Sequence, residues 1–195
     1  MINSSRSPLY KTLLATPDEV SVRIRDLATD VIAEYRTQSP LFVCLLRGGA
    51  PFAMQLMRDI AIQDQYFHPE MDYMTVSTYA SERTDSEPVL VMGLAPHTVV
   101  AGRRVVLLDD TLDKGVTADF ARQELRKQGA ADVDLIVLVD KQRPREDTFF
   151  VEATMAGFRL GSDVWLTGMG LDDARIAKEA NRWTGYVAAA IDEVS

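Results

Sequence analysis

The sequence has little that would support a disulfide, a zinc site or a membrane segment. Its one cysteine, Cys44, excludes a disulfide within the chain and lies in an apolar stretch, where an inert core thiol is expected. His68 and His97 stand apart from each other and from the cysteine, which argues against zinc. No apolar run approaches a membrane span, and residues 1–8 lack the apolar region of a signal peptide. We therefore expect a cytoplasmic protein.

Positive charge is also scarce. The chain has 21 Lys and Arg against 29 Asp and Glu, a net charge of −8, and no stretch concentrates the basic residues. This balance argues against binding to nucleic acid and to anionic membrane surfaces. No repeat, low-complexity tract or linker interrupts the 195 residues. We expect a single domain over residues 1–195, with residues 1–8 flexible.

What the chain does contain is an alternation of apolar strands and helical patterns. Thr16-Pro17-Asp18-Glu19 combines a cap, a proline and a capping-box acid, so it predicts the start of a helix that runs to Ser39-Pro40. The other expected helices are 52–62, 117–127 and a short one at 174–180. The expected strands are 41–46, 72–79, 89–92, 105–108, 133–139, 149–158 and 164–167, while 186–191 could be strand or helix. This order predicts an α/β fold with a doubly wound, mostly parallel sheet.

The most informative segment runs from Val105 to Thr117. An unbroken apolar run, Val105-Val106-Leu107-Leu108, indicates a strand buried on both faces, and Asp109 and Asp110 follow at its carboxyl end. A short loop with a third acid, Asp113, then leads into a helix. Ligands of open α/β sheets bind at such points. Backbone N–H groups at the helix start can hold a phosphate, and carboxylates can hold sugar hydroxyls or hydrated Mg²⁺. The segment therefore suits a sugar phosphate.

This segment resembles the phosphoribosyl pyrophosphate (PRPP) motif of type I phosphoribosyltransferases, a family whose fold adds a small hood over the base pocket. The resemblance implies that Asp109 and Asp110 hold the ribose hydroxyls, and that Asp109 also contributes to a metal site. It implies that the loop residues bind the 5′-phosphate; these are Lys114, Gly115, Val116 and Thr117. Lys114 departs from the usual Thr or Ser. Asp113 lies between the acids expected to hold the ribose and the loop expected to hold the phosphate, and it is expected to accept a proton from the base.

Two further segments resemble the hypoxanthine-guanine branch of that family. Leu46-Arg47-Gly48-Gly49 is similar to its Leu-Lys-Gly-Gly loop, which contacts pyrophosphate and has a non-proline cis peptide before the basic residue. The resemblance places Arg47 and Gly48 at pyrophosphate. Thr78 and Tyr79 fall on a Ser-Tyr dipeptide that opens a flexible catalytic loop, here residues 80–88.

The base pocket is expected from the later part of the chain. The resemblance implies that Lys141 donates to the 6-oxygen of a purine, that Trp165 stacks on the base and that Leu166 supplies backbone contacts. Asp172 falls where the family holds a second Mg²⁺. An arginine that contacts pyrophosphate usually lies six residues later. That position is Lys178 here, and Arg175 is the other candidate.

The resemblance implies purine salvage: a 6-oxopurine, hypoxanthine or guanine, reacts with PRPP to give IMP or GMP and pyrophosphate. It also implies Mg²⁺ as cofactor and a homo-oligomer, a dimer or a tetramer. Two alternatives stay open at this point. One is a PRPP-sensing regulatory protein of the same fold. The other is a phosphoribosyltransferase that acts on xanthine or on a non-purine acceptor.

Overall fold

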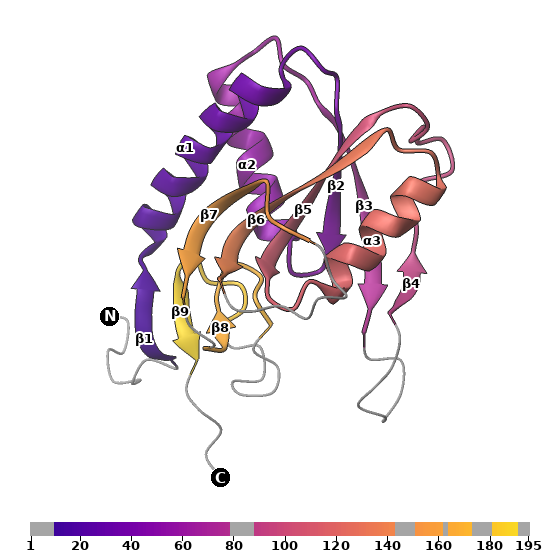
Figure 1. The fold of residues 1–195 in the computed structure, drawn as a ribbon. Coiled ribbons are helices and arrows are strands. Elements are labelled where there is room, and N and C mark those ends of the chain that lie inside the picture. Colours follow the sequence, from indigo (N-terminus) through magenta and orange to yellow (C-terminus); the bar gives the residue numbers. More distant parts are fainter. Residues whose placement is uncertain (1–9, 79–87, 143–150, 162–163, 173–180, 191–195) are drawn as a thin grey trace.

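A six-stranded sheet forms the centre of the protein. The computed structural model describes residues 10–78, 88–142, 151–161, 164–172 and 181–190. The strand order is β4-β3-β2-β5-β6-β7 (Figure 1), and all neighbours are parallel except β3 and β4. In chain order the strands of this sheet are β2 (Leu41–Leu46), β3 (Glu70–Ser77), β4 (Val89–Met92), β5 (Arg104–Leu112), β6 (Asp132–Lys141) and β7 (Met155–Leu160). The predicted mostly parallel α/β fold is confirmed.

A second, smaller sheet lies beside the carboxyl ends of the central strands (Figure 1). Its three antiparallel strands have the order β1-β9-β8, with bounds Tyr10–Ala15, Val187–Ala190 and Leu166–Thr167. This sheet is the small subdomain that the fold class required. Residues 186–191 could have been strand or helix from the sequence; the structure has a strand there, β9, which pairs with both other strands of this sheet. Strand β1 was not predicted from the sequence; Leu13 and Leu14 in it are part-exposed, so it lacks a buried apolar run.

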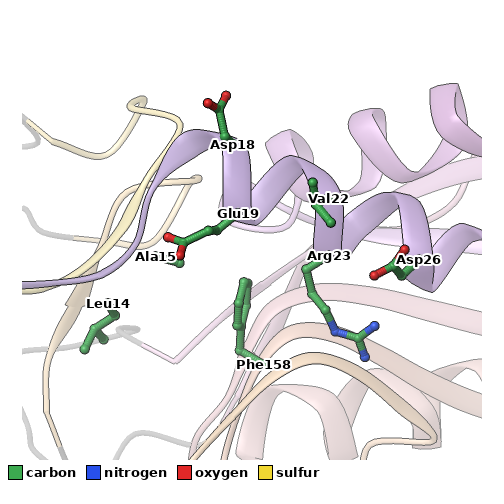
Figure 2. A pocket seen from close by; sticks show the side chains of 8 residues that line it. All are labelled: Leu14, Ala15, Asp18, Glu19, Val22, Arg23, Asp26 and Phe158. Carbon is green, nitrogen blue, oxygen red and sulfur yellow. The ribbon is translucent and has the colours of Figure 1, made fainter.

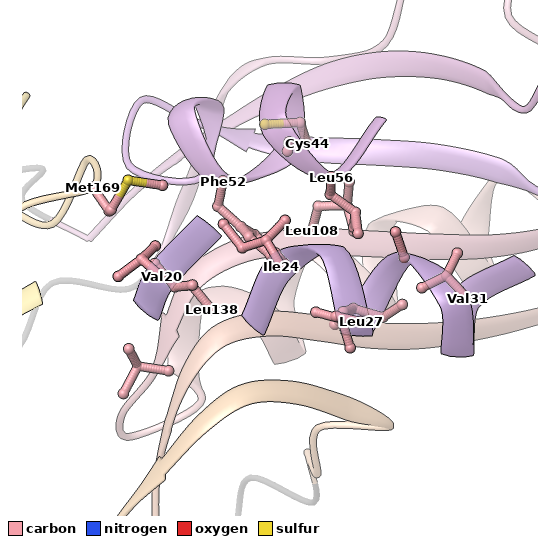
Figure 3. Packing of buried hydrophobic residues seen from close by; sticks show 14 of the residues in the cluster. Val20, Ile24, Leu27, Val31, Cys44, Phe52, Leu56, Leu108, Leu138 and Met169 are labelled. Carbon is pink, nitrogen blue, oxygen red and sulfur yellow. The ribbon is translucent and has the colours of Figure 1, made fainter. Parts of the chain in front are cut away.

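Helices cover both faces of the central sheet. Within the described residues the helices are α1 (Pro17–Tyr35), α2 (Ala50–Gln63) and α3 (Val116–Lys127). Helices α1 and α2 pack on one face, against alternate residues of the strands such as Phe42 and Leu108 (Figure 3). Helix α3 packs on the other face, against Val43 and Leu107. Successive residues of a strand point to opposite faces, so an unbroken apolar strand fills two cores at once.

Local signals explain where α1 begins. The hydroxyl of Thr16 accepts a hydrogen bond from the backbone N–H of Glu19 at 3.3 Å, and the Glu19 carboxylate accepts from the backbone N–H of Thr16 at 2.8 Å. The predicted capping box is therefore confirmed. Cys44 is fully buried, and burial raises the pKa of its thiol to about 12, in agreement with an inert core thiol. Among the described residues, no helix is long and apolar enough to cross a membrane.

Several predicted bounds were wrong. Strands β5 and β6 continue to Leu112 and Lys141, beyond the predicted ends at 108 and 139. The reason is their mutual pairing, which extends to Leu112 opposite Asp140. Asp109 and Asp110 thus lie within a strand and not after it. Strand β7 occupies 155–160 instead of 149–158, and β8 only 166–167 instead of 164–167. Strand β3 ends at 77, two residues before the predicted end.

Some predictions fall outside the described residues. The affected predictions are the flexibility of residues 1–8, nearly all of a loop at 80–88, a short helix at 174–180, and the roles of Tyr79, Arg175 and Lys178.

Candidate functional site

The predicted site residues that the structure describes come from different elements and lie toward one end of the central sheet. This is the end where β2, β5 and β6 finish (Figure 1). Ligands of open parallel sheets bind at this end, because the loops that follow the strands surround it.

The adjacent acids of β5, Asp109 and Asp110, form the floor of the site. The backbone N–H of Asp110 donates to Oδ1 of Asp109 at 2.9 Å, which holds the first carboxylate in place. Burial raises the pKa of Asp109 well above its usual value, and the negative charge of Asp110 adds to the effect. Burial also raises the pKa of Asp110, but attraction to Arg182 opposes that rise. Both side chains are only partly exposed, so their carboxylates are incompletely hydrated yet still reachable, and they can accept hydrogen bonds from ligand hydroxyls.

The loop after β2 lies directly against this acid pair. A Cβ atom on Gly48 would collide with the carboxylate of Asp110, and one on Gly49 would lie 2.7 Å from the carbonyl oxygen of Leu45. The bond between Leu46 and Arg47 is a cis peptide, as the resemblance implied. Only glycine allows the loop to approach β5 so closely. Arg47 and Gly48 are therefore brought to the acid pair, as expected for one binding site.

The loop between β5 and α3 ends in a helix start suited to an anion. Gly115 is the N-cap residue of α3, has a φ of +88° and makes no side-chain capping bond. Its carbonyl accepts the first helical hydrogen bond, from the N–H of Asp119 at 2.8 Å. The N–H groups of Val116 and Thr117 come before that bond and have no acceptor within the helix. Together with exposed Lys114, they give a place where phosphate can bind.

The ion pair between Lys141 and Asp113 joins the predicted base-binding residue to the predicted proton acceptor. Nζ of Lys141 lies 3.0 Å from Oδ2 of Asp113. The Lys141 side chain is 6% exposed and that of Asp113 is 34% exposed, so the pair opens to solvent on the Asp113 side. Pairing of β5 with β6 places the ends of these strands next to each other. The pair presents a cationic donor beside an anionic acceptor.

The segment from Trp165 to Asp172 closes another side of the site. Nε1 of Trp165 donates to the backbone carbonyl of Asp172 at 2.6 Å, which ties the two ends of the segment together. Between them, Gly170 has a φ of +93°, and a Cβ atom there would collide with the carbonyl oxygen of Gly48. The segment therefore packs on the loop after β2. Leu166 is buried in β8, opposite Ala189.

Arg182 is a site residue that the sequence analysis missed. Its side chain is 6% exposed, and Nη1 lies 3.4 Å from Oδ1 of Asp172. Its backbone carbonyl accepts from the N–H of Gly170 at 2.7 Å. The sequence analysis looked for a cation at the family spacing, whereas Arg182 lies ten residues after Asp172. The available signal was a further arginine in the same stretch, followed by a tryptophan.

Thr78, also predicted for the site, comes from the next strand of the sheet. It follows the end of β3, and β3 lies next to β2, so Thr78 stands one strand away from the loop that carries Arg47. Among the described residues, no group of three or more His, Cys, Asp or Glu side chains could hold a metal ion without a ligand's help.

A groove of about 460 Å³ lies elsewhere, along the first half of α1 (Figure 2). Leu14, Val22 and Phe158 supply apolar surface, and its acids are Asp18, Glu19 and Asp26. Arg23 also lines it, and its guanidinium donates to backbone carbonyls of β7. The groove shares no residue with the site described above, and its acids would repel a phosphate.

Comparison with known proteins agrees with this geometry. The phosphoribosyl transferase domain family matches residues 10–173. The hypoxanthine-guanine phosphoribosyltransferase of Bacillus subtilis is 29% identical over 162 residues, which is 83% of this chain and 85% of that protein. The bifunctional protein TilS/HprT of Listeria innocua is 32% identical over 172 residues, and this chain spans only 25% of its length.

Solved structures show the same fold. The crystal structure of a hypoxanthine phosphoribosyltransferase from Staphylococcus aureus superposes with a TM-score of 0.82 at 23% identity, covering 98% of this chain and 97% of that one. The family match covers most of the chain, and the fold agrees over nearly all of it. The chain therefore belongs to the phosphoribosyl transferase domain family.

Proposed function

We propose that this protein transfers the 5-phosphoribosyl group of PRPP to a 6-oxopurine, hypoxanthine or guanine, in purine salvage. The products are IMP or GMP and pyrophosphate. The observation that carries the proposal is the Lys141–Asp113 pair, 3.0 Å from Nζ to Oδ2, beside the acid pair of β5. The relatives named above support it, because the B. subtilis protein is named for this activity.

PRPP would bind along the loops that follow β5 and β2. Its 5′-phosphate fits the start of α3, with the backbone N–H groups of Val116 and Thr117 as donors and Lys114 as a nearby cation. Asp109 and Asp110 would accept hydrogen bonds from the ribose hydroxyls. Gly48 lies against Asp110, and Gly48 together with its neighbour Arg47 would bind pyrophosphate.

The base would be chosen by a donor at the end of β6, Lys141, and an acceptor directly after β5, Asp113. A 6-oxopurine carries an acceptor, the 6-oxygen, next to ring position 7, whose N–H can donate. Lys141 can only donate and an ionised Asp113 can only accept, so together they match that edge. Adenine has an amino group at position 6 and would leave Lys141 without an acceptor. Trp165 would stack on the ring, and backbone groups at Leu166 would contact its far edge.

In the transfer, the bond between C1 of the ribose and a pyrophosphate oxygen breaks, and a purine nitrogen forms the new bond to C1. The proton that the purine loses would pass to the carboxylate of Asp113. Mg²⁺, when bound, neutralises charge on the phosphates and so helps pyrophosphate to leave. Asp172 suits such an ion because its carboxylate is half exposed and Mg²⁺ usually binds through one or two carboxylates plus substrate phosphates. Asp109 would be a second contact.

In this function the protein would bind small molecules, PRPP and a purine base, and neither nucleic acid nor membrane. The net charge of −8 supports that restriction. It would work in the cytoplasm as a homodimer or homotetramer. Light scattering on the purified protein tests the assembly, and a mass of one chain would contradict it.

The deciding experiment is one assay of pyrophosphate release from PRPP and Mg²⁺ with each of five bases: hypoxanthine, guanine, xanthine, adenine and uracil. We expect turnover with hypoxanthine or guanine and little with adenine or uracil. Turnover with xanthine alone, or with uracil, would mean that this base is the acceptor and that hypoxanthine and guanine are not. No turnover with any base, while PRPP still binds, would favour a PRPP-sensing regulator.

A further inference from the structure

Arg182 holds the carboxylate to which a divalent ion would bind. Its Nη1 lies 3.4 Å from Oδ1 of Asp172, and its side chain is almost completely buried. The guanidinium also lies over the ring of Trp183, 5.3 Å from the centroid. Its main chain is fixed by the hydrogen bond from Gly170. The cation is therefore held in place by the fold and is not a surface side chain that happens to meet an acid.

The two partners of this ion pair differ in exposure. The Asp172 side chain is 48% exposed, whereas that of Arg182 is 6% exposed. A dissolved cation can reach Asp172 from the solvent side, but it would then lie close to the guanidinium. Two like charges a few ångströms apart repel each other, most strongly where solvent is partly excluded. A divalent ion alone must therefore compete with a positive charge that the protein already supplies.

A polyphosphate changes this balance. Its oxygens can accept two parallel hydrogen bonds from a guanidinium and can coordinate a metal ion at the same time. We propose that Arg182 is a resident counter-ion of Asp172 that disfavours divalent metal until a pyrophosphate group takes over its guanidinium. This inference rests on the proposed function, because it takes the pyrophosphate end of PRPP as the incoming anion.

Binding of Mn²⁺, followed by electron paramagnetic resonance, tests the inference without any turnover. Wild type is compared with Arg182→Gln and Arg182→Met, which remove the charge, and with Arg182→Lys, which keeps it. Arg126→Gln is the matched control for net charge, because Arg126 is exposed near the end of α3. MnCl₂ is added alone, without PRPP, pyrophosphate or base.

We expect the Gln and Met variants to bind Mn²⁺ roughly three- to tenfold more tightly than wild type, the size of effect that one partly exposed charge produces. Arg182→Lys and Arg126→Gln should bind it as wild type does. The gain should disappear when Asp172→Asn is added to Arg182→Gln, since the competed carboxylate is then missing. Unchanged or weaker Mn²⁺ binding in a folded Arg182→Gln variant, or a gain that survives Asp172→Asn, would overturn the inference.

A second measurement leaves the buried arginine in place. Asp172→Asn changes a half-exposed side chain, so the fold should tolerate it. With EDTA present, this variant should bind inorganic pyrophosphate roughly three- to tenfold more tightly than wild type, because the guanidinium no longer has to leave Asp172. Equal or weaker binding would contradict the inference. If these results hold but no base is turned over, only the proposed function fails.

Discussion

Replacing Lys141 by methionine should remove most of the preference for 6-oxopurines. The Lys141 side chain is 6% exposed, and its Nζ contacts Asp113 at 3.0 Å. Methionine keeps an unbranched stem of similar length at the end of β6, so packing is largely preserved, whereas alanine would also leave a cavity. The substitution therefore removes mainly the charged donor.

The expected size of the effect follows from that donor. Loss of a hydrogen bond to a charged group costs about 1.5–3 kcal/mol, or roughly ten- to a hundredfold in affinity. Hypoxanthine should lose this much, and adenine should lose little, because its 6-amino group accepts nothing from Lys141. The ratio of the two affinities should fall by the same factor.

Isothermal titration with hypoxanthine and with adenine measures these affinities, and a separate titration gives that of PRPP. Lys127→Met is the matched control, because Lys127 is 67% exposed at the end of α3. Unchanged hypoxanthine affinity would refute the role of Lys141 in the base pocket. An equal loss for PRPP and for hypoxanthine would also refute it, since Lys141 would then support the whole site.

Three further substitutions test other parts of the site. Asp113→Asn should lower turnover by about 10²–10⁴-fold while PRPP affinity changes little; steady-state rates beside PRPP titration decide, and unchanged turnover would exclude Asp113 as the proton acceptor. Asp109→Asn should raise Tm at pH 7, by roughly 2–4 °C for each kcal/mol regained. A raised pKa in the folded state means that ionisation of Asp109 costs stability as the pH rises above its unfolded pKa, so the gain should vanish near pH 4; a lower Tm at pH 7 would contradict this. Gly48→Ala should weaken PRPP binding at least tenfold, because its Cβ would displace the carboxylate of Asp110, and a titration that matches wild type would show that the loop can move without loss.

The sequence by itself determined the features that depend on neighbouring residues. Thr16 and Glu19 form the predicted capping box because both partners lie within one turn of a helix. Strands β2 and β4 have the predicted bounds, since their apolar runs end where polar or turn residues begin. The order of strand, acids, glycine and helix from Val105 to Thr117 also fixed which residues line the loop.

Tertiary structure decided whatever depends on pairing between distant segments. Strand β5 extends to Leu112 only because β6 continues beside it. The same pairing brings Lys141 to Asp113, 28 residues away, a contact that no local pattern encodes. Gly170 can approach the carbonyl oxygen of Gly48 because Gly170 has no side chain, and Gly48 can approach Asp110 for the same reason; both steric facts are visible only once the two loops are in place.

Arg182 shows the same division most clearly. In the sequence alone, Arg182 is one of several basic residues after Asp172. The spacing typical of the family indicated Lys178, and not Arg182, as the cation that contacts pyrophosphate. Its burial and its contact with Asp172 arise because β8 and β9 pair and fold the chain back over the loop after β2. Sequence patterns can state which charges are present. The free energy of burying a charge depends on every segment packed around it, so only the folded chain decides which charge serves the site.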